Sequence, residues 1–263
     1  MAPEDGSDCH TLLLRAEPAL RHVKNHGKNN IALYHLFFHH QDLECQLAMS
    51  FRSALQNGKF YLCYQLKFNL TEHSIASDEA LIRWNSPVPD NVSPVVFTPA
   101  AEKNGIIFEL TKWILEEACR QMKQWNQSGH PIKRVAVNIS APLFLSDSLP
   151  EMISKILYDY QLPAHQLELE ITETAIIEYF DKELHVIHLL KKVEISILLN
   201  DFGTGVSSLI YLKKLSIDTL KIDKSFIDGV HTSFEYKALV KMIIQLAKLF
   251  KLSVVAEGVE KKE

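Results

Sequence analysis

Oxygen-bearing side chains recur at the ends of short apolar segments from residue 79 onward. The set consists of Glu79, Asn138, Glu170, Asn200, Asp201, Asp223, Glu257 and Glu260. Carboxylate and amide oxygens are the ligands that hard divalent cations such as Mg²⁺ and Mn²⁺ prefer. One lysine, Lys221, belongs to the same pattern. Together they predict a two-metal site at which a water, activated by the ions, hydrolyses a phosphate ester.

The residue types also suggest individual roles. Lys221 would neutralise charge that develops on the phosphorus oxygens, or orient the water, and Glu257 would take a proton from that water. A single acid at a strand end is more often a helix N-cap or a surface ion-pair partner, and this simpler interpretation applies to Asp223 and Glu260 taken singly. It does not extend to the whole set, because random placement rarely puts polar groups at the same end of several strands.

The segments that carry these residues alternate between strand and helix patterns. We expect strands at Phe60–Leu66, Ser74–Arg83, Arg134–Ile139, Gln166–Thr172, Ile195–Leu199, Thr219–Asp223 and Ser253–Val259. We expect helices at Leu110–Gln127, Leu149–Tyr160, Ala175–Val193, Val206–Lys214 and Phe234–Lys251. Most of the strands form continuous apolar runs, which is typical of a parallel sheet covered on both faces.

This alternation predicts a parallel α/β fold, either an open doubly wound sheet or a closed (β/α)₈ barrel. No Gly-rich dinucleotide loop follows the first strand, which favours the barrel. In a barrel the carboxyl ends of the strands meet at one face, so the polar residues would converge there.

Several local features lead to further predictions. Pro87–Pro99 holds four of the ten prolines, which predicts a long ordered loop. Ser148 is a plausible N-cap for the helix that follows it. Asn57-Gly58 is a stop signal for a helix over Asp42–Gln56. The residues before it, with a helix at Thr11–Lys24 and a strand at Ile31–Phe38, are too few to bury a core alone.

Composition narrows the class of protein. The 263 residues suffice for one large domain or two small ones, and 47% hydrophobic and 23% charged residues are ordinary for a globular chain. The net charge of −4 argues against binding DNA or RNA through bulk charge. Four cysteines without a CxxC pair predict reduced thiols in a cytoplasmic protein. No segment approaches the ~18–20 apolar residues of a membrane helix.

Six motifs follow one another along the chain: Asp78-Glu-Ala-Leu-Ile-Arg-Trp84, Val135-Ala-Val-Asn-Ile-Ser140, Leu167-Glu-Leu-Glu-Ile-Thr-Glu173, Asp201-Phe-Gly-Thr-Gly-Val-Ser-Ser-Leu209, Thr219-Leu-Lys-Ile-Asp223 and Val255-Ala-Glu-Gly-Val-Glu260. In this order they resemble the motifs of the EAL domains, which are cyclic-di-GMP-specific phosphodiesterases. The resemblance implies a modified (β/α)₈ TIM-type barrel with an antiparallel first strand. It also implies hydrolysis of cyclic di-GMP to linear pGpG with two Mg²⁺ or Mn²⁺ ions, and by analogy a homodimer.

Residue roles follow from the same resemblance. It assigns metal binding to Glu79, Asn138, Glu170, Asn200, Asp201 and Glu257, with Glu257 and Lys221 as the catalytic pair. It assigns substrate contact to Leu81 and Arg83, with Arg83 on a phosphate. Glu173, Asp223 and Glu260 are expected in supporting positions behind the ligands, with Glu173 holding the loop that starts at Asp201.

The chain before the barrel resembles the last third of a GGDEF domain, on Pro3-Glu-Asp-Gly6, Leu12-Leu-Leu-Arg-Ala-Glu-Pro-Ala-Leu20, Lys24 and Gly27-Lys-Asn29. The expected organisation is a remnant over residues 1–40, a linker helix over 41–57 and an EAL domain over 58–263. No cyclase activity is expected. The family continues past the last residue here with a helix and a strand, so we expect a barrel without its last strand and helix.

One departure from the family concerns the chemistry. The family usually has Asp-Asp-Phe-Gly where this chain has Asn200-Asp201-Phe-Gly, and the first Asp usually bridges the metals. An amide is uncharged and bridges two dications poorly. Three functions follow: a phosphodiesterase impaired by Asn200 and the missing strand; an inactive module that binds cyclic di-GMP or a protein; or a fragment that does not fold alone.

Overall fold

The computed structural model describes residues 9, 50–85, 92–130, 132–144, 146–173, 175, 180–203, 212 and 214–259. Almost all of the predicted GGDEF remnant, most of the predicted helix Val206–Lys214, and Glu260 lie outside these residues. The chain forms two compact units. One contains the residues up to Phe60 together with Trp84–Ile106, and the other contains Tyr61–Arg83 and the residues from Ile107 onward.

The first unit is organised by aromatic rings. Phe51, Phe60, Trp84 and Phe97 are each at most 4% exposed, and the rings of Phe51 and Trp84 stack with their centroids 4.8 Å apart. Phe51 belongs to a helix over residues 50–56, which ends before Asn57 as the sequence predicts. Gly58 follows with a φ of +61°, a conformation that glycine adopts without strain.

Helix α3, Pro94–Lys103, corrects the second part of the loop predicted over Pro87–Pro99, and residues 87–91 of that loop lie outside the described residues. Pro94 occupies the start of the helix, where no backbone N–H is needed, and Pro99 lies inside it. Phe97, Ala100 and Ala101 of this helix are fully buried. Burial of this apolar face therefore outweighs the local cost of the inner proline.

The second unit is built on a seven-stranded sheet with the order β1-β2-β3-β4-β5-β6-β7. The strands are β1 Phe60–Asn69, β2 Ser74–Trp84, β3 Val135–Asn138, β4 Leu167–Thr172, β5 Ser196–Phe202, β6 Thr219–Ile222 and β7 Ser253–Ala256. Strands β2 to β7 are parallel to their neighbours. Only a short turn joins β1 to its neighbour β2, so β1 is antiparallel. All seven predicted strands are confirmed, with ends shifted by a few residues.

The sheet curls. Lys221 on β6 donates a hydrogen bond of 2.8 Å to Glu79 on β2. In a flat sheet these strands would lie about 19 Å apart, at about 4.8 Å per strand, which is too far for the two side chains to span. Lys67 on β1 and Glu170 on β4 form a second ion pair of this kind. The curled mixed sheet fits a modified TIM barrel.

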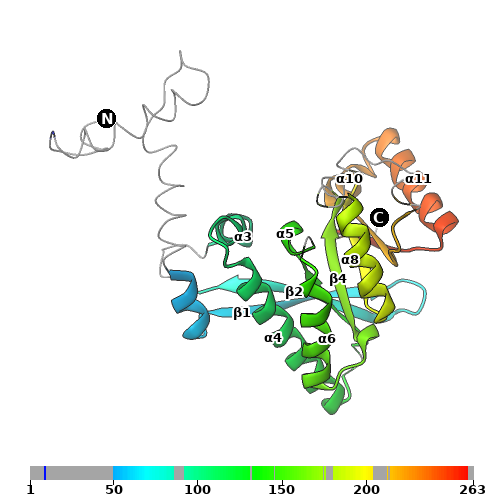
Figure 1. The fold of residues 1–263 in the computed structure, drawn as a ribbon. Coiled ribbons are helices and arrows are strands. Elements are labelled where there is room, and N and C mark those ends of the chain that lie inside the picture. Colours follow the sequence, from blue (N-terminus) through cyan, green and yellow to red (C-terminus); the bar gives the residue numbers. More distant parts are fainter. Residues whose placement is uncertain are drawn as a thin grey trace. The chain divides into compact units, whose positions relative to one another are not determined.

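Helices cover the outer face of this sheet (Figure 1). They are α4 Ile107–Ser128, α5 Ala141–Phe144, α6 Ser148–Tyr160, α8 Phe180–Lys192, α10 Lys224–Gly229 and α11 Phe234–Phe250, with a 3₁₀ turn at Ala164–Gln166. Helix α4 packs on β3 and α6, α8 packs on β5 and α6, and α11 packs on β6 and β7. Among the described residues, no helix is long and apolar enough to cross a membrane.

Two sequence expectations change in detail. Asp147, not Ser148, is the N-cap residue of α6, and the Ser148 hydroxyl instead bonds that of Ser146 at 2.7 Å. The expectation that strands are continuous apolar runs does not hold for β4, which places Glu168 and Glu170 on its inner face. A barrel interior accepts such charges only when they are paired, and these are.

Candidate active site

Lys221 is the centre of a buried ion cluster at the carboxyl ends of the strands. Its ammonium lies 2.8 Å from Glu79 Oε2, 3.2 Å from Glu170 Oε2 and 3.9 Å from Glu257 Oε2. Burial alone would lower the pKa of Lys221, but the charges of Glu170 and Glu79 outweigh it and raise that pKa. The lysine is therefore fully charged at neutral pH, as a group that neutralises phosphate oxygens must be.

The two buried carboxylates next to Lys221 have pKa values that are shifted in opposite directions. Burial opposes ionisation of Glu79, yet Lys221 and a 2.9 Å hydrogen bond from Asn138 Nδ2 lower its pKa. Burial raises the pKa of Glu170, whose side chain is fully enclosed. The register of β3 against β4 sets Asn138 beside Glu170. Residues from β2, β3, β4 and β6 thus meet at one point.

A second group of carboxylates lies beside the first. Asp201, Asp223 and Glu257 each offer an oxygen, and these oxygens lie within 4.8 Å of one another. All three side chains are partly exposed, and the Glu257 side chain is 40% exposed. Asp223, which was expected behind the ligands, therefore contributes directly to this group. It is also the N-cap of α10, where hydrogen bonds from the Ser225 hydroxyl and then from the Ser225 N–H lower its pKa.

A bulge in β5 aims Asp201 at this group. Asn200 and Asp201 lie inside β5, not after it as expected, and the register against β6 shifts between Leu199 and Phe202. Asp201 has a φ of +56°, and its N–H donates to Asn200 Oδ1 at 2.9 Å. Bulges of this kind redirect side chains near functional sites. Burial, followed by the charge of Asp223, raises the pKa of Asp201.

The remaining expected residues are distributed around these two groups. Glu173 accepts the Gly203 N–H at 2.9 Å, so it holds the backbone next to Asp201. Arg83 donates to the Ile82 carbonyl at 2.9 Å, and Leu81 is half-buried on β2. Glu260 lies outside the described residues.

Sequence reasoning missed a layer of charges below the site. Lys67 pairs with Glu170 and lies 3.6 Å from Glu168 Oε2. Arg134 lies 3.2 Å from the other oxygen of Glu168, which also accepts from the Thr219 hydroxyl at 3.3 Å. Glu168 stands two residues before Glu170, so strand alternation could have placed it on the same face. Lys67 is the one charged residue of β1, which was the available signal.

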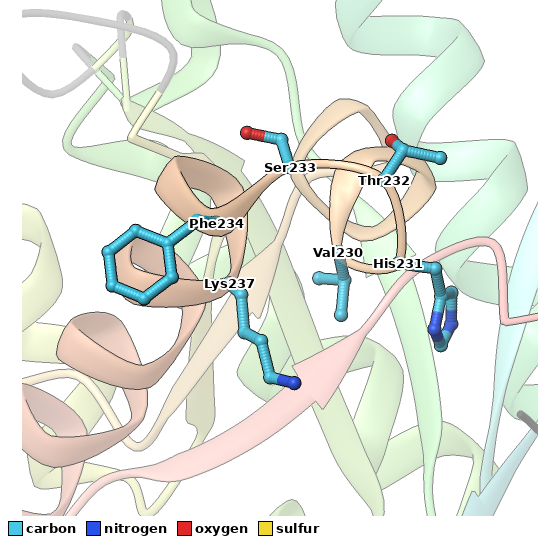
Figure 2. A pocket seen from close by; sticks show the side chains of 6 residues that line it. All are labelled: Val230, His231, Thr232, Ser233, Phe234 and Lys237. Atoms are coloured by element: carbon cyan, nitrogen blue, oxygen red, sulfur yellow. The ribbon is translucent and has the colours of Figure 1, made fainter.

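A hollow of about 450 Å³ lies elsewhere in this unit, at the connection between α10 and α11. It is lined by Val230, His231, Thr232, Ser233, Phe234 and Lys237. Figure 2 shows Lys237, Val230 and His231 extending to one side of this connection. None of the strand-end carboxylates lines it, so the convergent charges and not this hollow define the candidate site.

Comparison with known proteins identifies the family. The model of the EAL domain matches residues 48–263, so the chain belongs to the EAL domain family. It is 36% identical over 259 residues to the bifunctional diguanylate cyclase/cyclic di-GMP phosphodiesterase MucR of Pseudomonas aeruginosa, covering 98% of this chain and 38% of that protein. It is 31% identical over 261 residues to the cyclic di-GMP phosphodiesterase PdeR of Escherichia coli, covering 99% of this chain and 39% of that protein.

Solved structures agree with this assignment. A PaMucR phosphodiesterase in complex with c-di-GMP is 37% identical with a TM-score of 0.78, over 82% of this chain and 88% of that one. The EAL enzyme Bd1971, bound to cAMP and cyclic di-GMP, is 28% identical with a TM-score of 0.77, over 98% of this chain and 68% of that one. The chain spans about two fifths of the length of the two curated relatives named above.

Proposed function

We propose that this chain is a cyclic-di-GMP phosphodiesterase domain that opens one phosphodiester of the ring to give linear pGpG. The observation that carries the proposal is the convergence of acids from separate strands around the buried Lys221. The names of the relatives MucR and PdeR, and the c-di-GMP in the structure of PaMucR, support the choice of substrate.

The donor set fits a pair of Mg²⁺ or Mn²⁺ ions. Every donor is an oxygen, three of the carboxylates cluster within 4.8 Å, and no thiolate or imidazole takes part in that cluster. The residues that would hold the ions are Glu79, Asn138, Glu170, Asn200, Asp201, Asp223 and Glu257. When bound, such ions polarise phosphate oxygens and make a coordinated water acidic.

Each side chain of the site has a separate role in the proposed hydrolysis. Glu257 accepts the proton of the attacking water on its partly exposed carboxylate, and the water oxygen forms the new bond to phosphorus. Lys221 stabilises the negative charge on the phosphorus oxygens while the bond to the leaving 3′-oxygen breaks and that oxygen takes up a proton. Glu173 fixes the backbone at Gly203 beside the ligands. Arg83 would contact a phosphate of the substrate and Leu81 its remainder.

A second function, binding without turnover, is favoured by Asn200. Its amide is uncharged, and the Oδ1 that could reach an ion already accepts the Asp201 N–H at 2.9 Å. A site that lacks one bridging charge can hold cyclic di-GMP and yet align the ions poorly for attack.

Product analysis separates these two functions. The full chain is incubated with cyclic di-GMP and Mn²⁺, and pGpG is measured by chromatography. Calorimetry with Ca²⁺ in place of Mn²⁺ measures binding alone. Release of pGpG that disappears in Glu257→Gln but persists in the exposed control Glu72→Gln supports the enzyme. Heat of binding without pGpG supports the binding module, and neither heat nor product would overturn both.

A further inference from the structure

Lys67 occupies the side of Glu170 that faces away from Lys221. Its ammonium donates a hydrogen bond to Glu170 Oε1, while Lys221 donates to Glu170 Oε2 at 3.2 Å. The Lys67 side chain is 10% exposed and that of Glu170 is 0% exposed. Both oxygens of a proposed metal ligand are thus occupied by ammonium groups. A divalent ion that binds either oxygen of Glu170 therefore lies beside the positive charge of an ammonium group, which repels it.

The two lysines differ in what they could do next. Lys221 is tied to Glu79 at 2.8 Å, closer than to Glu170, and belongs to the proposed catalytic pair. Lys67 has a second buried carboxylate already within reach, because Glu168 Oε2 lies 3.6 Å away. The other oxygen of Glu168 is engaged by Arg134 and Thr219, so Glu168 is fixed in place. Lys67 can therefore leave Glu170 without becoming an unpaired buried charge, which would be costly.

We infer that Lys67 is an internal counter-ion of the site, which pairs with Glu170 in the metal-free chain and shifts to Glu168 when Glu170 binds a divalent ion. This inference rests on the proposed two-metal function. Lys67 lowers the affinity of the site for metal, and it stabilises the barrel interior when no metal is bound. A lysine suits this role because its compact ammonium sits on a flexible stem.

A counter-ion role and a merely structural role of Lys67 predict opposite changes in metal affinity when Lys67 is replaced. If Lys67 only positions Glu170, its removal disorders the ligand and weakens metal binding. If Lys67 competes with the metal, Lys67→Met raises the affinity, because a unit positive charge beside a dication is worth about tenfold or more even in water. If Glu168 is the alternative partner, Glu168→Gln lowers the affinity several-fold, because Lys67 then has only Glu170.

The test is a Mn²⁺ titration of the full chain at pH 8 without cyclic di-GMP, followed by calorimetry and by the electron paramagnetic resonance signal of free Mn²⁺. The variants are Lys67→Met, Glu168→Gln and the double variant. The controls are Lys133→Met and Glu72→Gln, an exposed pair at the same 3.6 Å separation. Urea denaturation in EDTA checks each variant for folding and should show Lys67→Met less stable than the parent.

The expected result is tighter Mn²⁺ binding in Lys67→Met, weaker binding in Glu168→Gln and affinities within twofold of the parent in both controls. In the double variant the effect of Glu168→Gln should vanish, since Glu168 acts through Lys67. Unchanged or weaker binding in Lys67→Met overturns the inference alone. If that variant does not fold, an unchanged affinity in Glu168→Gln overturns it. A parent chain that binds no Mn²⁺ overturns the proposed function as well.

Discussion

Asn200→Asp tests the central chemical question, because it restores a charge beside the cluster of Asp201, Asp223 and Glu257. The three oxygens already lie within 4.8 Å of one another. Two like unit charges ~4 Å apart repel by about 1 kcal/mol in water and by more at lower dielectric, so a fourth carboxylate next to this cluster is costly. The carboxylate can still accept the Asp201 N–H, so the hydrogen bond of 2.9 Å survives the change. We expect a loss of about 1–3 kcal/mol in the free energy of unfolding when no metal is present.

Divalent ions reverse the sign of this effect. The added charge that repels its neighbours attracts a dication, so Mg²⁺ affinity should rise about tenfold or more. Because ligand binding to the native state adds to stability, the variant should lose its deficit as Mg²⁺ is added. If the proposed function is correct, release of pGpG from cyclic di-GMP should rise in parallel, since an aspartate at position 200 would help to hold the ions that polarise the phosphate oxygens.

The assay is urea denaturation of the parent and the variant in EDTA and in saturating Mg²⁺, together with chromatography of pGpG. Asn126→Asp is the matched control, because it makes the same chemical change at an exposed amide that bonds Gln166. If Asn200→Asp is as stable as the parent in EDTA and binds Mg²⁺ no more tightly, the charge at position 200 does not face the ions.

Three further predictions follow from buried groups. Lys221→Met leaves the buried Glu79 without its ammonium partner and Glu170 with Lys67 alone, and it should lower the free energy of unfolding by about 3–5 kcal/mol, measured by urea denaturation in EDTA. Asp78 is 0% exposed, and neither carboxylate oxygen has a hydrogen-bond partner within the described part of the chain. Burial raises its pKa, so it stabilises the fold below its unfolded pKa and loses that contribution as pH rises through the folded pKa. Asp78→Val should therefore be about 1–3 kcal/mol more stable than the parent at pH 7, with the gap closing toward pH 4, and a constant gap would contradict this. Burial raises the pKa of Cys119 to about 12, so iodoacetamide at pH 8 should modify the exposed Cys63 in the native chain and Cys119 only in urea, as read by peptide mass spectrometry.

The sequence was sufficient for the strands and for the identity of the converging acids. Short Val- and Ile-rich runs set the strands, and the parallel barrel then brings their carboxyl ends together. Local spacing could not reveal the pair of Lys67 and Glu170, which are 103 residues apart, because that contact depends on how strongly the sheet curls. The bulge at Asp201 was equally hidden, since a left-handed aspartate has no signature in a single chain.

Helix α3 is a case in which a local sequence signal was present but gave the wrong prediction. Prolines at positions 94 and 99 argue locally for a loop, yet the chain there is helical. What decides is burial of Phe97 against Trp84, a residue of β2 that precedes the predicted loop in the sequence. Tertiary packing therefore overrides a local signal where enough apolar surface is removed from water.

The charge balance of the site suggests that Asn200 affects how strongly the binding of the metal ions and of the nucleotide are coupled. Glu79, Glu170, Asp201, Asp223 and Glu257 carry five negative charges, and Lys67 and Lys221 offset two of them. The remaining three do not match the four positive charges of two dications, whereas an aspartate at position 200 would supply the fourth. In the parent chain a phosphodiester of cyclic di-GMP, the substrate proposed above, would supply the missing charge.

The second ion and the nucleotide should therefore bind cooperatively in the parent chain, each raising the affinity for the other by the same factor. In Asn200→Asp the site is balanced without the nucleotide, so the coupling should shrink. Calorimetric titration of cyclic di-GMP at increasing Ca²⁺ concentrations, in both proteins, measures this factor directly. Equal coupling in the two proteins would show that charge at position 200 does not control how the second ion is held.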